Sequence, residues 1–288
     1  MNKRSIGRAF AITMALMLAF ALVYTFIFAS NDLLLPGDNE IIVAFLDVGQ
    51  GDSVLIRSRD HAVLIDGGDI SRDAPVLMYL RRAGVSRLDY VIATHPHRDH
   101  IGGLIAVLNR VDVGRVLMPD VVHTTEVFVN FISVIENNHI PAHAPTPEES
   151  FRAGIIEFTV LAPAVGFAGN NVNDASIVLR LDHGETSFLF TGDAEANSEQ
   201  AMLASGQDLR ADVIKIGHHG SRTSTTDVFL SNVLPTAAVI SVGGGNRFGH
   251  PHYEVLERLA NHGIQVFRTD EMGTVIMATD GKRVVLLP

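Results

Sequence analysis

One short stretch, Thr94-His95-Pro96-His97-Arg98-Asp99-His100, constrains this chain more than any other. It places three histidines and an aspartate within six residues. The apolar run 88–93 before it predicts a buried strand, and the apolar run 101–108 after it predicts a helix with Asp99 as its cap. The cluster therefore belongs at the carboxyl end of a strand, where open α/β sheets bind their ligands.

The spacing of these side chains suits metal ions better than a histidine-rich surface loop, which is the simpler alternative. His95 and His97 stand two apart in extended chain, so both imidazoles leave the same side. Asp99 and His100 follow after the chain has begun to turn, so they face a neighbouring point. Two adjacent donor sets predict one or two divalent ions, a pair lying about 3.5–4 Å apart. The chain has no cysteine, so zinc or manganese must be held by imidazoles and carboxylates.

The pattern His-x-His-x-Asp-His resembles the signature of the metallo-β-lactamase superfamily. The turn Asp47-Val48-Gly49-Gln50-Gly51-Asp52-Ser53, which could by itself be an ordinary hairpin turn between two strands, closely resembles a motif in the hydrolase domain of ComEC-type competence DNA-uptake proteins. The resemblance extends from about Glu40 to the C-terminus. It implies an α/β fold, the αββα sandwich, in which two mixed sheets form the core, helices cover both outer faces and the site lies along one edge.

The same resemblance implies roles for residues far from the first cluster. Asp193, at the end of the predicted strand 186–190, matches the aspartate that bridges both ions. His218 and His219 follow the predicted strand 212–216, and either can ligate the second ion; we prefer His218. Asp99 is expected to be both ligand and catalytic group, and His250 to be a catalytic group on the substrate side. The expected metal ligands are therefore His95, His97, Asp99, His100, Asp193, His218 and His219.

One position departs from the broad superfamily. Many members carry a third metal-binding histidine near 169–176, and this chain has none there. Asp174 could supply an oxygen ligand instead. Lys215 is either a strand lysine or a phosphate contact, and His123, His139 and His143 are expected to be surface histidines. The residues expected to support ligands or contact substrate are Asp47, Gln50, Asp52, Asp66, Asn173, Asp174, Ser176, Lys215, Ser221 and His252.

The N-terminus has a composition of its own. Basic residues within 1–8 precede an uncharged apolar run at 9–29, and 21 residues at about 1.5 Å each span the thickness of a bilayer core. A cleaved signal peptide and a buried core helix are the alternatives. We expect a cytosolic tail at 1–8, a transmembrane signal anchor at 9–29, a linker at 30–39 and the hydrolase domain at 40–288. The charge asymmetry then places that domain outside the cytosol.

The net charge of −10, with only three lysines, argues against a surface that coats nucleic acid. Any contact with DNA must be local, through ions and a few arginines. We expect a metal-dependent hydrolase, a phosphodiesterase or nuclease acting on single-stranded DNA or a nucleotide outside the cytosol. The alternatives are a hydrolase of a small ester, lactam or nucleotide, and a non-catalytic, metal-stiffened DNA-binding module. The partners expected are the membrane, through a single span, and the nucleic acid or nucleotide substrate.

Overall fold

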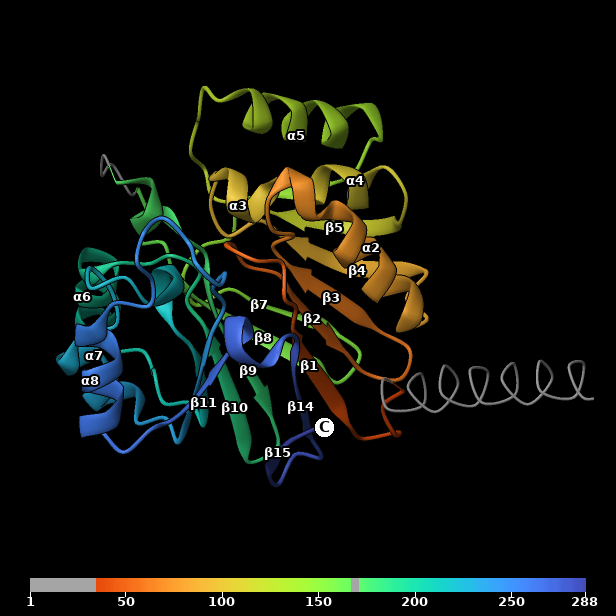
Figure 1. The fold of residues 1–288 in the computed structure, drawn as a ribbon. Coiled ribbons are helices and arrows are strands. Elements are labelled where there is room, and N and C mark those ends of the chain that lie inside the picture. Colours follow the sequence, from red (N-terminus) through yellow and green to blue (C-terminus); the bar gives the residue numbers. More distant parts are fainter. Residues whose placement is uncertain (1–34, 167–170) are drawn as a thin grey trace, which may run out of the picture. The chain divides into compact units, whose positions relative to one another are not determined.

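The computed structural model describes residues 35–166 and 171–288. Residues 36–288 form one compact unit, in which two β-sheets face each other and helices cover both outer faces (Figure 1). The expected anchor at 9–29 lies outside the described residues. Within the described ranges, no helix combines the length and apolar character needed to cross a membrane.

The first sheet is mixed because a meander of antiparallel strands continues into parallel crossovers. Its strands are antiparallel from β15 to β3 and parallel from β3 to β6. Every residue of β1, β2 and β3 is buried, since the sheet is covered on both faces, and this explains why all but Arg57 are apolar. In spatial order the strands are β15 (Val284–Leu286), β14 (Val275–Thr279), β1 (Ile41–Phe45), β2 (Val54–Arg57), β3 (Ala62–Ile65), β4 (Arg87–Ile92), β5 (Asp112–Leu117) and β6 (Ala142–His143).

The second sheet is mixed in the same way. Its strands are parallel from β13 to β10 and antiparallel from β10 to β7. The parallel strands end at the same edge of the sheet, which gathers the loops that follow β10 and β11. The strands are β13 (Gln265–Arg268), β12 (Ala237–Ile240), β11 (Val213–Lys215), β10 (Thr186–Phe190), β9 (Val178–His183), β8 (Ile156–Ala162) and β7 (Ser150–Ala153).

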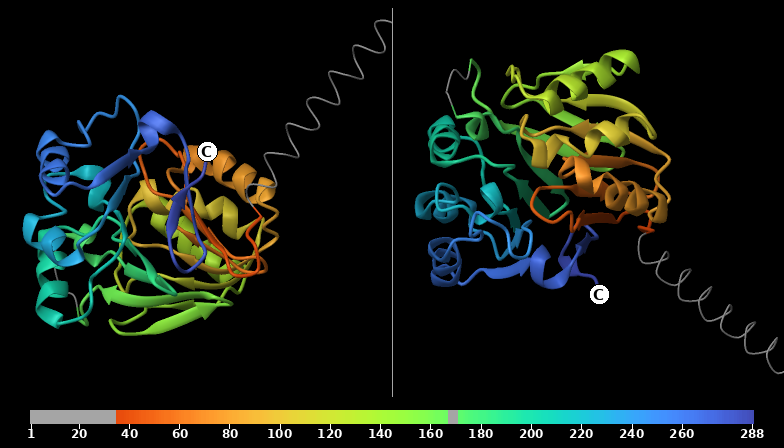
Figure 2. Two further views of the ribbon diagram at one scale, coloured as in Figure 1. Left: turned by 90° about the horizontal axis from the view of Figure 1, so that it is seen from below. Right: turned by 45° about the horizontal axis from the view of Figure 1, so that its top comes forward.

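The main core lies between the sheets, where Phe45 meets Phe190 at a ring-centroid distance of 6.1 Å and Phe158 meets Phe190 at 6.5 Å. A second core lies where the helices of the second sheet bury residues such as Met202 and Leu259. Figure 2 shows the layers from two further directions. The helices beside the first sheet are α2 (Asp73–Arg82), α3 (Arg98–Ile101), α4 (Leu104–Leu108) and α5 (Glu126–Asn137), and those beside the second are α6 (Ala196–Ser205), α7 (Asp227–Val233) and α8 (Tyr253–Asn261).

The helix expected after the histidine cluster differs from the prediction. It is split into α3 and α4 at Gly102-Gly103, and the N-cap position of α3 is His97. Asp99 lies inside the first turn and is not the cap, because its carboxylate faces His219 instead, with 3.5 Å between Oδ2 and Nε2. The segment 139–149 contains the short strand β6, and the chain also forms the short helices α7 and α9 (Thr269–Met272). The 3-10 turns are η1 (Ile70–Arg72), η2 (Val172–Ala175) and η3 (Gly217–Gly220).

Candidate metal centre

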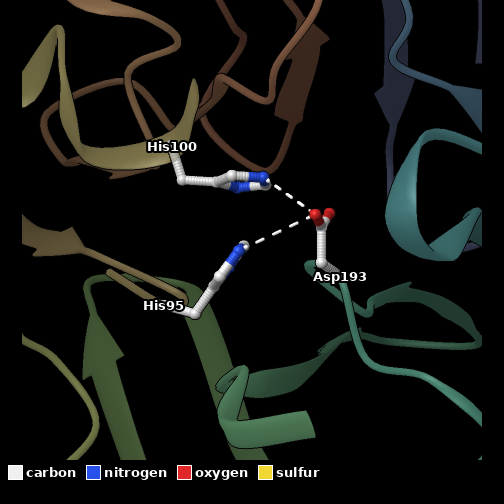
Figure 3. A group of neighbouring side chains, drawn as sticks. All are labelled: His95, His100 and Asp193. Carbon is white, nitrogen blue, oxygen red and sulfur yellow. Dashed lines mark ion pairs between the residues drawn. The ribbon is translucent and has the colours of Figure 1, made fainter. Parts of the chain in front are cut away.

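Four loops bring the candidate ligands together at one edge of the sandwich. The loop after β4 and the turn of α3 supply the histidine cluster, the end of β10 supplies Asp193, and η3 after β11 supplies His218 and His219. The turn between β1 and β2 adds Asp52. Figure 3 shows His95 and His100 reaching from one side toward Asp193 on the other. Residues almost 100 positions apart thus face a common point, because the strands before them end there.

Asp193 lies at the middle of this cluster, and its side chain is 2% exposed. Its Oδ2 atom lies 3.2–3.8 Å from the Nε2 atoms of four imidazoles, those of His95, His100, His218 and His219. One carboxylate oxygen this close to several imidazole nitrogens could hold a divalent ion together with them.

Two groups of donors lie beside that carboxylate, and His100 is close to both. His95 Nε2 and His97 Nδ1 lie 3.0 Å apart, close to the spacing of about 3.4 Å between donors of one tetrahedral zinc ion. Ligand atoms of Asp99, His100 and His219 all lie within 4.8 Å of one another, and so do those of His95, His100 and Asp193. The set around Asp99 therefore contains His219, and the geometry favours it over His218, which we had preferred from the sequence.

Buried polar atoms that lack a hydrogen-bond partner indicate that these residues can hold divalent ions. Among the described residues, His100 Nε2, His219 Nε2 and Asp193 Oδ1 are buried and have no hydrogen-bond partner. A buried polar atom without a partner is costly in free energy. His100 Nε2 and His219 Nε2 lie 3.2 and 3.6 Å from Asp193 Oδ2, so a cation bound beside that carboxylate would satisfy both imidazoles.

The other ring nitrogen of each of three histidines is held by a fixed acceptor. His100 Nδ1 donates to Asp66 Oδ2 at 2.8 Å, and Thr94 donates to the same carboxylate from N and Oγ1. His219 Nδ1 donates to the Ser241 carbonyl at 2.9 Å, and His218 Nδ1 to Glu195 Oε1 at 2.8 Å. These bonds fix each ring with Nε2 toward the centre, as in many metal sites.

Thr94, Glu195 and Ser241 were not predicted as part of the site. Glu195 is 23 positions from His218, and Ser241 is 22 positions from His219. The only local signal was that Glu195 follows Asp193 by two residues, which puts both carboxylates in one strand-end loop.

The backbone of the histidine pair is strained. His218 and His219 have φ values of 46° and 52°, a region that residues other than glycine rarely occupy. Strain of this kind persists where the surrounding structure holds it, most often at functional sites. It turns the two rings apart, to an interplanar angle of 67°, so that adjacent histidines reach different partners.

The charges in the cluster are coupled. Burial opposes the charge of His219, yet Asp193 and Asp52 outweigh it and raise the pKa of His219 to about 10. Burial likewise opposes the charge of Asp193, but His100 and His219 hold its pKa well below the ordinary value. Protons on these imidazoles therefore balance the buried carboxylates, and a bound cation would take over that role.

The stretch 171–176 supports the ligands and does not provide one. Asp174 Oδ1 accepts the N–H groups of Glu195 at 3.0 Å and Ser198 at 3.2 Å, at the start of α6. Its Oδ2 accepts from two asparagine side chains, so the suggestion that Asp174 replaces the missing histidine finds no geometric support. Asn173 donates to Glu195 Oε1 at 3.0 Å, and Ser176 Oγ accepts the N–H of Asp193 at 3.1 Å.

Lys215 is engaged inside the protein. It is 2% exposed, pairs with Asp52 and donates to the Gly192 carbonyl at 2.8 Å. Of its two expected roles, the geometry favours that of a structural strand lysine over a phosphate contact.

The other expected supporting residues lie around the cluster and not in it. Gln50 Oε1 accepts the N–H of Gly243 at 3.3 Å, which ties the motif turn to the glycine-rich loop. Asp47 is exposed and accepts the N–H of Gly49 within its own turn at 3.0 Å. Ser221 Oγ lies 2.9 Å from Thr223 Oγ1, and His252 Nδ1 accepts the N–H of Arg222 at 3.1 Å.

Two further histidines lie beside the ligands. His250 packs 5.5 Å from His218 and 6.3 Å from His219, measured between ring centroids. Burial, followed by the charges of His219 and His218, lowers the pKa of His250 to about 4, so its imidazole is neutral at pH 7. His123, expected to be an isolated surface histidine, lies 6.0 Å from the His97 ring.

Fold and site together identify the family. The chain belongs to the metallo-β-lactamase superfamily, whose family model matches residues 46–244. The expected αββα arrangement of two mixed sheets and flanking helices is confirmed. A solved structure, the metallo-β-lactamase fold protein YhfI from Bacillus subtilis, shares the fold with a TM-score of 0.57 at 13% identity over 83% of this chain and 100% of that chain.

Competence proteins are among the curated relatives. The chain is 30% identical over 251 residues to ComE operon protein 3 of Bacillus subtilis, covering 81% of this chain and 32% of that protein. It is 32% identical over 250 residues to competence protein ComA of Neisseria gonorrhoeae, covering 83% and 32% respectively. The expected resemblance is confirmed, and the chain spans about a third of the length of these relatives.

Proposed function

We propose that this protein is a metal-dependent phosphodiesterase that hydrolyses DNA or a nucleotide outside the cytosol. The observation that carries the proposal is the Asp193 carboxylate, whose Oδ2 lies 3.2–3.8 Å from four imidazole nitrogens. Zinc or manganese held there would lower the pKa of a coordinated water and neutralise charge that develops on a phosphate. The competence relatives support DNA as the substrate class.

The protein's own groups prepare this chemistry. His95 and His100 are fully buried, while the Asp99 side chain is 31% exposed and lies between the ligands and solvent. We infer that Asp99 would help to hold a second ion and would accept the proton of the nucleophile. Asp66 and Thr94 hold the His100 ring in one tautomer, so no reorganisation is needed during the reaction.

Two other functions predict different results. A hydrolase of small esters or lactams would use the same donors, since the fold does not select the substrate. A non-catalytic DNA-binding module would bind metal without turnover. The basic residues before the apolar run 9–29 support a membrane anchor with the domain outside the cytosol, and a C-terminal reporter that is active only in the cytosol should then be silent.

The test uses the full chain in detergent with Mn²⁺ or Zn²⁺, given single-stranded DNA, a simple phosphodiester and a chromogenic lactam. Asp99→Asn should lose about 10²–10⁴-fold in turnover and keep its fold, because it loses a ligand and a proton acceptor. Arg98→Ala is the matched control, since within the described part of the chain Arg98 forms an ion pair with Asp69 at 2.7 Å and is no ligand candidate.

Activity in Asp99→Asn equal to that of the unaltered protein, or activity that persists after thorough chelation, would refute the mechanism. If the lactam is hydrolysed and the phosphodiester is not, the proposed metal centre is supported but the proposed substrate class is wrong.

A further inference from the structure

A row of aromatic rings leads from the metal centre to the surface along the loop 243–252. The His250 ring lies 6.3 Å from that of His219, and the Phe248 ring lies 5.6 Å beyond His250 at an interplanar angle of 23°. Phe248 is 48% exposed, although phenylalanine usually buries its ring. The row therefore ends in an aromatic surface that water contacts, two rings away from a candidate ligand.

The loop holds Phe248 in this place. The Asn246 side chain donates to the carbonyls of Gly243 and His250, at 2.9 and 2.6 Å. The same side chain accepts the N–H groups of Phe248 and His250, both at 3.1 Å. These four hydrogen bonds of the Asn246 side chain constrain the loop that carries the exposed Phe248 ring.

Arg247 extends this surface. Its guanidinium carbon lies 4.9 Å from the centre of the Phe248 ring, the geometry of a cation–π contact. Within the ranges 35–166 and 171–288, Arg247 is not among the arginines that pair with a carboxylate. A guanidinium without a carboxylate partner among the described residues thus lies over the exposed Phe248 ring, next to the centre.

We propose that Phe248 and Arg247 form a stacking surface for a nucleobase of single-stranded nucleic acid, next to the phosphate held at the metal centre. This inference rests on the proposed function and names how the substrate is recognised. With a net charge of −10, the protein has little basic surface to hold the phosphate backbone. Stacking on an aromatic face needs no net charge and tolerates every base, and it contributes about 5- to 150-fold in affinity per base.

The test compares a short single-stranded DNA with the same strand made abasic, using the full chain in detergent with Mn²⁺. Phe248→Ala should raise KM for the normal strand about 5- to 150-fold with little change in kcat, and should leave the abasic strand unaffected. Phe248→Trp should retain the low KM. Phe248→Leu should not, because it keeps apolar area but lacks a ring face. Val228→Ala, an exposed apolar residue on α7, is the surface control and should change nothing.

The inference and the proposed function fail in different ways. Equal KM values for Phe248→Ala and the unaltered protein, or full rescue by leucine, would overturn the stacking surface while the phosphodiesterase stands. If no phosphodiester is cleaved, fluorescence anisotropy of labelled single-stranded DNA measures binding directly. The same affinity for normal and abasic strands would then overturn the inference by itself.

Discussion

In the metal centre, the role of a single residue depends more on its hydrogen-bond partners than on its residue type. The two histidines of η3 are chemically the same, yet His218 is held by Glu195 and His219 by the Ser241 carbonyl. Their left-handed backbone sends the rings to different neighbours, and only His219 falls within the set that contains Asp99. A residue's role here is thus a consequence of which groups fix its ring.

The raised pKa of His219 leads to a prediction about metal binding at pH 7. A pKa of about 10 keeps the His219 ring protonated in the chelated protein, so an ion that binds Nε2 must displace that proton. Proton release should therefore accompany binding, and the apparent affinity should rise with pH until His219 is neutral. Calorimetry in two buffers with different ionisation enthalpies measures the released protons.

His250→Gln is the control for this measurement, because a pKa of about 4 already leaves His250 neutral at pH 7. It should not change the number of protons released, whereas His219→Gln should lower it. Binding without any proton release would show that His219 is not a ligand.

Lys215 leads to a prediction about stability. Lys215→Met leaves the carboxylate of Asp52 buried without its ammonium partner, because both side chains are 2–3% exposed. Breaking a buried pair in this way typically costs about 3–5 kcal/mol. Urea unfolding of the chelated protein should show a loss of this order, and Asp52→Asn in the same chain should recover part of it. A loss below about 1 kcal/mol, the size of an exposed pair, would contradict this account.

Among the elements, the turn 46–53 explains why a hairpin motif belongs to a metal centre. The Asp52 N–H donates to the Asp99 carbonyl at 3.2 Å, and Gln50 accepts from Gly243. A Cβ on Gly51 would collide with the Asp99 carbonyl, and the φ of Gly51 is +136°. The turn therefore packs against the ligand loop on one side and the glycine-rich loop on the other.

Gly51→Ala should thus both destabilise the protein and weaken metal binding, since Asp99 must shift to make room. Gly206→Ala is the matched control: its φ is +76°, but nothing lies within 4 Å of its added Cβ. The control should lose about 1 kcal/mol, from backbone strain alone. Thermal melting with and without Mn²⁺ compares the two. An equal loss of stability in both variants, with and without Mn²⁺, would mean that the close approach of Gly51 to Asp99 affects neither stability nor metal binding.

For the whole molecule, the structure leads to a prediction about independent folding. Residues 36–288 form one compact unit that contains both sheets and every candidate ligand. We expect this fragment to fold without the residues before it and to melt cooperatively. Mn²⁺ at 100 times its Kd should stabilise it by about 2.7 kcal/mol, because the ion binds only the folded state. An insoluble or non-cooperative fragment would contradict the expected domain boundary.

The sequence alone predicted the elements and the donors that lie close together along the chain. Strands such as β1 and β3 were readable because both faces are buried and their runs are apolar. The cluster at 95–100 was readable because its donors lie within one turn of each other, where spacing decides direction. The exception, Asp99 as a cap, shows that even there a tertiary partner can outweigh local preference.

Only the tertiary structure decided how distant donors are used. It assigned His219 to the Asp99 set, engaged Asp174 at the start of α6, and paired Lys215 with Asp52. The sequence could not rank these choices, because it contains neither the direction of a side chain nor the identity of its neighbour 20 or more positions away. Those depend on how the two sheets end at one edge, and packing of the whole sandwich determines where that edge lies.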